Sequence, residues 1–287
     1  MKRFLPLFCL TLILFSFNSD KQAFLLYDSK AKQLAYDKML AAILKEKPDV
    51  VLFGEQHNNP ICHWLELELS TDIYAALKDK LVLGAEMFES DNQVILNEYL
   101  AGKVNEKTFS TEAKVWPNYK TDYKPLLDLA KDNHLQFIAT NIPTRYSRMV
   151  YNTGFAVLDS IDPDSKKWIA PLPVRYNEYL KCYQNIFKAA EGHGSPNLPK
   201  SQAIKDATMA SFILKNHSKG QLFLHFNGAY HSNNSEGIVW YLKQAQPDLK
   251  IIVISSVEQE NITKLEKESV GIANYVICIP STMSKTY

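Results

Sequence analysis

The feature that most restricts the fold is a series of short apolar segments separated by amphipathic ones. The segments are residues 50–53, 81–85, 135–139, 222–226, 251–254 and 275–279. Their length and their content of Val, Ile, Leu and Phe are typical of strands that are buried on both faces. Because such strands alternate here with helical patterns, the sequence predicts an α/β fold with a mostly parallel central sheet flanked by helices.

One long stretch departs from this alternation. Residues 145–218 contain no apolar run typical of a strand and are predicted to form helices near 145–152, 176–191 and 201–217, with prolines between them. We therefore expect a largely helical inserted subdomain at about 100–218. It is predicted to form a cap or lobe beside the edge at which the parallel strands end.

The N-terminus has the pattern of an exported protein. Two basic residues precede an apolar run at 4–17, which is too short to span a bilayer as a stable helix and ends in polar residues. Residues 1–19 are therefore predicted to be a signal peptide, and residues 20–287 the mature domain, periplasmic or associated with the cell surface. A lipid anchor is not expected, because Cys9 lies inside the apolar run rather than just after it.

Charge and cysteine content exclude several classes of protein. Lys and Arg number 32 against 31 Asp and Glu, so the chain lacks the basic excess typical of proteins that bind duplex nucleic acid, and no nucleic-acid partner is expected. Cys62, Cys182 and Cys278 are odd in number and widely spaced. We predict that they are buried, free thiols rather than ligands of a zinc site. The alternative is that two of them form one disulfide in an oxidising compartment.

Polar side chains follow the predicted strands at the point where each strand ends. Glu55 and His57 follow the first strand in a Gly-x-x-His (GxxH) motif, and His231 ends a second GxxH motif after the fourth strand. Glu86 follows the second strand. Because the carboxyl ends of parallel strands lie at one edge, where open α/β sheets bind ligands, we expect these side chains to meet there.

This set of side chains suits two kinds of chemistry. His57, Glu86 and His231 are candidate ligands of a divalent transition metal. Glu55 could then act as a general base that activates water, which makes all four residues catalytic candidates. The plainer interpretation is that the histidines hydrogen-bond within loops and that Glu86 caps the next helix. His63, six residues after His57, could approach the site, although a surface position is favoured.

The ordered series of motifs resembles the ChaN-like haem-binding uptake proteins of the Tiki superfamily. The matching segments are residues 51–57, 84–89, Trp116 with 123–127, 141–143, Gln202 with 206–210, and 228–231. The resemblance implies an α/β domain with a helical subdomain, in an exported protein of haem or iron acquisition. It also implies haem held between the subunits of a homodimer, with Tyr or His on the iron, and a connection to outer-membrane haem-uptake machinery.

Two functions are open. The first is haem binding, for which the helical region offers Tyr176, Tyr179, His193 and Arg145 as cofactor-binding candidates; the further candidates there are Tyr183, Arg148 and Arg175. Tyrosine suits ferric iron, but with 15 tyrosines in the chain the sequence singles out no axial ligand.

The second is a metal-dependent hydrolase, since the wider superfamily includes metal-dependent proteases and erythromycin-esterase-like hydrolases. In those proteins the two GxxH histidines and a Glu carry the chemistry, which the resemblance places on His57, His231, Glu55 and Glu86. A metal at His57, Glu86 and His231 would lower the pKa of bound water. Haem binding is placed first because the resemblance extends over most of the mature chain.

Overall fold

The central sheet is mixed and mostly parallel, as predicted. The structure is a computed structural model that describes residues 21–189 and 194–287. Its eight-stranded sheet has the order β2-β1-β8-β7-β3-β6-β4-β5. The parallel strands are β3 (Val50–Glu55), β4 (Leu81–Glu89), β5 (Gln136–Asn141), β6 (Leu222–Gly228), β7 (Ile251–Gln259) and β8 (Tyr275–Pro280). The predicted signal peptide and His193 lie outside the described residues.

Two short antiparallel strands at one edge were not predicted. β1 (Leu25–Asp28) pairs antiparallel with β8 and with β2 (Gln33–Leu34). The amphipathic pattern of residues 28–47 predicts a single helix, but α1 (Tyr36–Glu46) begins only after these strands. Strands of four and two residues carry too little periodicity to be recognised, and their pairing depends on β8, which lies at the far end of the sequence.

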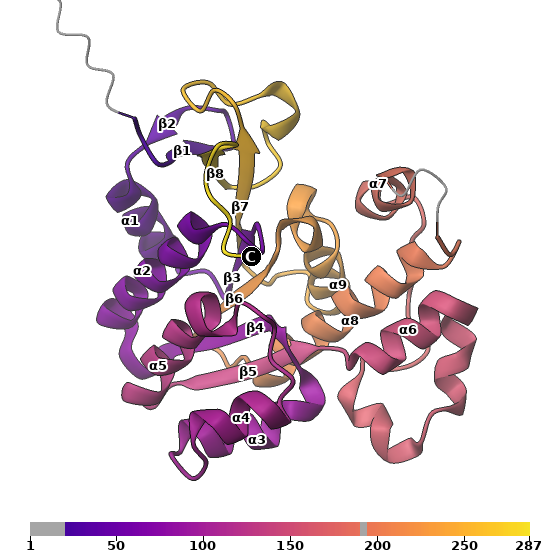
Figure 1. Cartoon of the computed structure of the whole chain (residues 1–287). Helices are drawn as coiled ribbons and strands as arrows, with labels where there is room; N and C mark the ends of the chain where they lie inside the picture. The colour runs from indigo at the N-terminus through magenta and orange to yellow at the C-terminus, as the bar shows by residue number, and fades with distance from the viewer. Residues whose placement is uncertain (1–20, 190–193) are drawn as a thin grey trace, which may run out of the picture.

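Helices cover both faces of the sheet. They are α1 (Tyr36–Glu46), α2 (Pro60–Leu77), α3 (Gln93–Leu100), α4 (Glu106–Glu112), α5 (Lys124–Asp132), α6 (Thr144–Thr153), α7 (Lys181–Ala189), α8 (Leu198–Asn216) and α9 (Ile238–Ala245). Figure 1 shows α1, α2 and α5 on one face of the sheet and α8 and α9 on the other. No described helix has both the length and the hydrophobicity needed to cross a membrane.

The two faces are separated by the alternation of side chains along each strand. In β3, Val51 and Phe53 belong to the core beneath α1 and α2, whereas Val50 and Leu52 pack with Met209 of α8 and with α9. Both sets are almost completely buried. This burial on two faces explains why the strand residues form an uninterrupted apolar run in the sequence.

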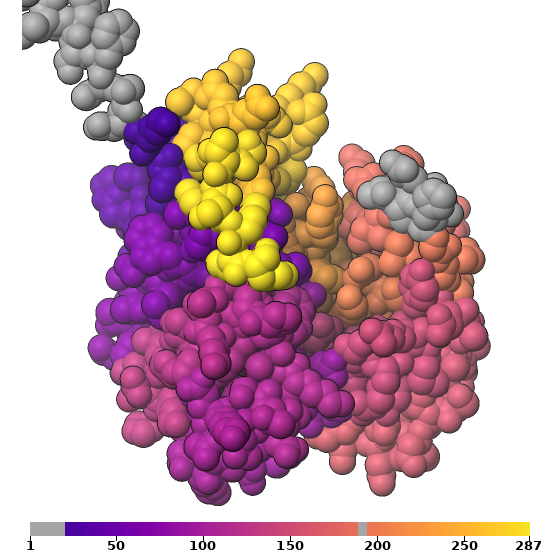
Figure 2. Space-filling model, in the orientation of Figure 1, coloured from indigo at the N-terminus to yellow at the C-terminus, as the bar shows by residue number. Residues whose placement is uncertain are grey.

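A separate helical layer stands beside the sheet edge. It includes α6, α7 and part of α8, and its own apolar cluster contains Tyr146, Val150, Leu158 and Ile204. Figure 1 shows α6 and α7 to the side of the sheet, and Figure 2 shows a hollow between this layer and the rest of the same face. The two helices α4 and α5 lie within the predicted range 100–218 but pack in the main core, for example through Phe109 and Leu126.

Candidate functional site

The sheet brings the two GxxH motifs side by side. β3 and β6 are parallel neighbours, with Glu55 opposite Gly228, and β4 lies on the other side of β6. His57, Glu86 and His231 line one cavity of about 520 Å³ at this edge, facing the helical layer. The expected convergence of these three side chains is therefore observed, while their chemical roles stay predictions.

His57 is held by a carboxylate behind it and is open to the cavity in front. Its Nδ1 donates a 2.7 Å hydrogen bond to Oε1 of Glu55, and the hydroxyl of Tyr123 donates a second 2.7 Å bond to the same oxygen. The side chain of His57 is 38% exposed. Gly228 lies so close that a Cβ there would be 2.8 Å from Nε2 of His57, so the glycine gives the ring its room.

The pKa of His57 is raised above its ordinary value. Burial alone lowers the pKa, but the hydrogen bond to Glu55 and the negative charge of Glu86 outweigh it. Because Glu55 fixes Nδ1 as the donor, Nε2 is the nitrogen available on the cavity side for a proton or a ligand.

His231 is held much more tightly, between two carboxylates. Its Nδ1 lies 2.5 Å from Oδ1 of Asp206 and its Nε2 lies 3.2 Å from Oε1 of Glu86. Tyr183 donates a 2.7 Å hydrogen bond to Asp206, and the backbone N–H of Gly228 donates a 2.8 Å bond to Glu86. All three charged side chains are buried.

These contacts make His231 a fixed cation. Burial lowers its pKa, but Glu86 and Asp206 outweigh burial and raise the pKa to about 10. Burial acts to raise the pKa of Glu86, yet the positive charge of His231 holds it well below its usual value. Since both ring nitrogens donate to carboxylates, neither has a free lone pair for a metal in this arrangement.

The predicted metal ligands do not form a compact set of donor atoms. Among the described residues, the one group of three such side chains whose ligand atoms all lie within 4.8 Å of one another is Glu55, His63 and Glu66. A metal shared by His57, Glu86 and His231 therefore stays a prediction, and it requires His231 to give up its contact with Glu86.

The helical layer supplies the opposite wall of the cavity. Arg148 and Tyr151 of α6 and Lys205 of α8 line it, and Tyr230 stands between the strand edge and solvent with 67% of its surface exposed. The helical layer therefore presents two cationic side chains and one phenol toward the cavity that His57 faces, and Tyr230 adds a second phenol from the strand edge. Of the further sequence candidates, Arg148 is the one that lies here.

The other haem-binding candidates that lie in the described part of the chain do not line this cavity. Tyr179 is 77% exposed, and Tyr176 packs against Tyr183. Tyr183 is buried and bonded to Asp206, which makes it a support for His231. Arg145 forms an ion pair with Asp91.

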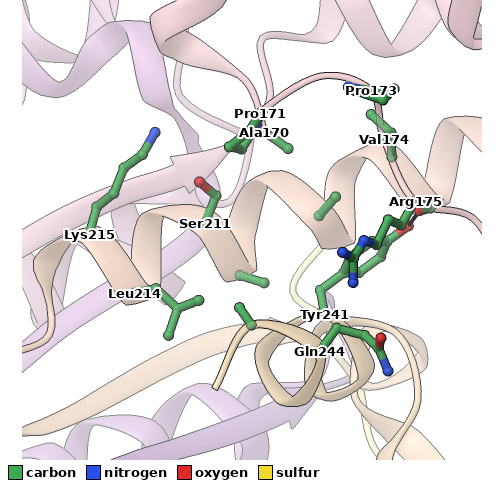
Figure 3. Close-up of a pocket in the computed structure, with 13 residues that line it drawn as sticks. Ala170, Pro171, Pro173, Val174, Arg175, Ser211, Leu214, Lys215, Tyr241 and Gln244 are labelled. Atoms are coloured by element: carbon green, nitrogen blue, oxygen red, sulfur yellow. Dashed lines mark hydrogen bonds between the residues drawn. The ribbon is translucent and has the colours of Figure 1, made fainter. Parts of the chain in front are cut away.

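Arg175 lies at a second cavity, near the C-terminal half of α8. This cavity has a volume of about 460 Å³ and a mainly apolar lining that includes Pro171, Val174 and Leu214. Figure 3 shows Lys215 entering it from α8 and Tyr241 from α9, and the hydroxyl of Tyr241 bonds the backbone oxygen of Arg175 at 2.7 Å. The residues that line this second cavity include no histidine and no carboxylate, so it has no ion pair like that of His231 with Glu86.

Sequence reasoning missed two residues next to the site. Asp206 lies in a segment that matches the family, but no local pattern predicts that it holds His231. His63 was expected at the surface, but it is only 5% exposed and lies behind His57, whose backbone oxygen accepts a 3.1 Å bond from its Nε2. The signal for His63 was its spacing of three residues from Glu66, which places both side chains on one face of α2.

Most of the chain matches a known protein family. The family described as haem-binding uptake, Tiki superfamily, ChaN matches residues 40–242. The chain belongs to this family. Among curated proteins, none matched the sequence.

Several solved structures are similar. A structure described as cofacial heme binding to ChaN of Campylobacter jejuni is 17% identical, with a TM-score of 0.66, and the match covers 88% of this chain and 96% of that one. A Bacillus cereus protein is 11% identical, with a TM-score of 0.48 over 84% of this chain and 91% of its own. An erythromycin esterase mutant is 10% identical, with a TM-score of 0.43, 88% of this chain and 82% of its own being covered. The ChaN likeness supports the fold.

Proposed function

We propose that this member of the ChaN family binds haem in the cavity between the strand edge and the helical layer. The observation that carries the proposal is the make-up of that cavity in a chain of a haem-binding uptake family. Iron ligands are at hand in Tyr230, Tyr151 and Nε2 of His57, and the cations Arg148 and Lys205 suit the carboxylates of the propionates.

The size and polarity of the cavity fit such a ligand. Its volume of about 520 Å³ lies within the range of about 300–1,000 Å³ that is common for cavities holding small molecules and cofactors. The exposed position of Tyr230 at the rim leaves room for a macrocycle that extends beyond one subunit. A homodimer that holds haem between its subunits is part of the same proposal; the Campylobacter structure is described as cofacial heme binding.

The decisive experiment is a haemin titration of the protein without residues 1–19, followed by absorption spectroscopy. We expect a shifted Soret band and a charge-transfer band if a phenolate binds ferric iron. Tyr230→Phe and His57→Gln should separate the two types of ligand. Tyr179→Phe is the matched control, because Tyr179 is an exposed tyrosine outside the cavity.

Two results would contradict this assignment. If the absorption spectrum of haemin with this protein is the same as that of haemin bound nonspecifically by albumin, the proposal of haem binding is rejected. Loss of the spectrum in Tyr179→Phe, but not in Tyr230→Phe or His57→Gln, would place haem on the outer surface of the helical layer instead of in the cavity.

Export forms part of the same proposal. A haem-uptake protein works outside the cytoplasm, which agrees with a signal peptide at 1–19 and with delivery of haem to or from outer-membrane uptake machinery. N-terminal sequencing of protein recovered from an extracytoplasmic fraction should give a start near residue 20. A start at Met1 in the purified protein would contradict the predicted cleavage.

A second candidate is hydrolysis, and the pairing of His57 with Glu55 favours it. A half-exposed imidazole with a carboxylate on Nδ1 can accept a proton from water at Nε2. Where a divalent metal bound here, it would supply a more acidic water. Ester and peptide hydrolysis should be lost in His57→Ala; turnover that is absent, or unchanged by His57→Ala, would reject this candidate.

A further inference from the structure

Behind His57 lies a buried group of acidic side chains around His63, which we call the inner cluster: Glu55, His63, Glu66 and Asp122. Glu55 ends β3, His63 and Glu66 lie on α2, and Asp122 lies in a π-helical turn at Tyr119–Tyr123. All four are at most 5% exposed. The ligand atoms of Glu55, His63 and Glu66 lie within 4.8 Å of one another.

The hydrogen bonds of His63 determine which of its nitrogens faces the carboxylates. Nε2 lies 3.1 Å from the backbone oxygen of His57, which can only accept, so Nε2 carries a hydrogen. Nδ1 then lies 3.2 Å from Oε2 of Glu66 and 3.7 Å from Oε2 of Glu55. A neutral His63 turns the lone pair of Nδ1 toward these two oxygens, so either a proton or a cation must lie between them. Burial and the charge of Glu55 raise the pKa of Glu66 and favour a proton on its carboxyl when no cation is bound.

Two oxygens of the cluster have no hydrogen-bond partner. They are Oε2 of Glu55 and Oε1 of Glu66, and both belong to side chains that are at least nine-tenths buried. Within the described residues, no Lys or Arg forms an ion pair with Glu55, Glu66 or Asp122. When Glu66 is ionised, a single positive charge on His63 leaves three buried carboxylates with an excess of negative charge.

We propose that Glu55, His63 and Glu66 bind a divalent transition metal ion. One imidazole nitrogen with carboxylate oxygens is a donor set suited to the ions from Mn²⁺ to Zn²⁺. The ion would take up the two unpartnered oxygens and the lone pair of Nδ1, and would balance the buried negative charge.

Asp122 positions this site from the outside. Its Oδ2 lies 3.3 Å from Nε2 of His63 and accepts hydrogen bonds from Asn118 at 2.7 Å and from Thr286 at 2.8 Å. A carboxylate on the far nitrogen of a ligating histidine is the usual way in which proteins orient the ring. The C-terminal segment thereby closes the cluster against α2 and the π-helical turn.

The ion belongs to a site distinct from the cavity, but Glu55 connects the two. One oxygen of Glu55 accepts from His57 and the other faces His63. A cation on the inner side makes Glu55 a weaker acceptor on the outer side. Metal loading therefore adjusts how firmly His57 is held toward the cavity without the ion touching a ligand there.

The test is metal binding by the whole protein without residues 1–19, dialysed against chelator and free of haem. Mn²⁺, Co²⁺ and Zn²⁺ are added singly, and stoichiometry, calorimetric affinity and the visible spectrum of Co²⁺ are measured. We expect one ion per chain and a rise in melting temperature of about 5 °C at a hundredfold excess over the dissociation constant. Glu66→Gln should weaken binding at least about 100-fold, because loss of an outer partner alone costs up to that much.

Matched variants keep the test decisive. Glu68→Gln changes the same residue type on the exposed side of α2 and should bind the ion as the unaltered protein does. Without metal, Glu66→Gln should be folded and about as stable as the parent, because burial raises the pKa of Glu66 and the amide has the shape of its neutral carboxyl. The absence of binding by every ion, binding that survives in Glu66→Gln, or binding lost in His231→Ala but kept in Glu66→Gln would each overturn the proposal.

Discussion

The two histidines of the GxxH motifs follow neighbouring strands with the same spacing, yet they occupy contrasting surroundings. His57 has one carboxylate partner and a half-exposed ring, whereas His231 is buried between Asp206 and Glu86. The pKa of both is raised, that of His231 to about 10. The comparison teaches that one motif can place an adaptable, accessible imidazole beside a permanently charged one.

The largest expected difference between the two is in stability. His231→Ala leaves Glu86 and Asp206 buried without their cation, so it should lower the free energy of unfolding by about 3–5 kcal/mol. His57→Ala leaves Glu55 with its bond from Tyr123 and should cost only about 1 kcal/mol. Urea denaturation at neutral pH measures both; equal losses would mean that the two sites are equivalent after all.

Stability should also depend on pH through His231. Its folded-state pKa, about 10, lies above the ordinary unfolded value, so its contribution is complete below about pH 6.5 and is lost as pH rises toward 10. The free energy of unfolding should therefore fall over this window with a slope of up to about 1.4 kcal/mol per pH unit.

Variants assign that slope to one histidine. Urea unfolding at several values between pH 7 and pH 10 should give a nearly flat dependence in His231→Gln and an almost unchanged one in His57→Gln. A slope that survives in His231→Gln would show that another group titrates in this window.

The smallest change is expected for Gly228→Ala, which tests His57 alone. The backbone at Gly228 has a φ of −57°, which alanine adopts readily, but the new Cβ would meet the His57 ring at 2.8 Å. Because that ring is half-exposed it can turn aside, so the free energy of unfolding should fall by only about 1 kcal/mol. Haemin affinity should fall about tenfold. Haemin binding equal to that of the parent would mean that the position of His57 does not matter for the ligand.

The strands and the convergence at their ends could be predicted because they depend on local pattern and on general topology. A run such as Val50 to Phe53 is apolar throughout because both faces of β3 are covered. Once the strands are parallel, their carboxyl ends share an edge, which is why Glu86 could be placed near both histidines. The polar partners of His231 could not be predicted in the same way, since Asp206 comes from the middle of α8.

The candidate haem ligands also show that contacts between distant segments could not be predicted from the sequence. Tyr176, Tyr179 and Arg145 were selected by residue type within a helical region, and the fold turns them away from the cavity that His57 lines. Which face of a helix points toward a cleft depends on how the helix packs against its neighbours. That packing is set by the apolar cluster of the helical layer around Tyr146 and Ile204, and no local pattern reports it.

By itself the sequence determined the α/β class, the family and the gathering of His57, Glu86 and His231 at one edge, because periodicity and motif spacing act over short distances. The tertiary structure alone decided that His231 is locked between two carboxylates, that His63 lies inside and that Glu55, His63 and Glu66 form a buried donor set. The physical reason is that charge states and ligand geometry depend on burial and on contacts between α2, α8 and the sheet, which lie far apart along the chain.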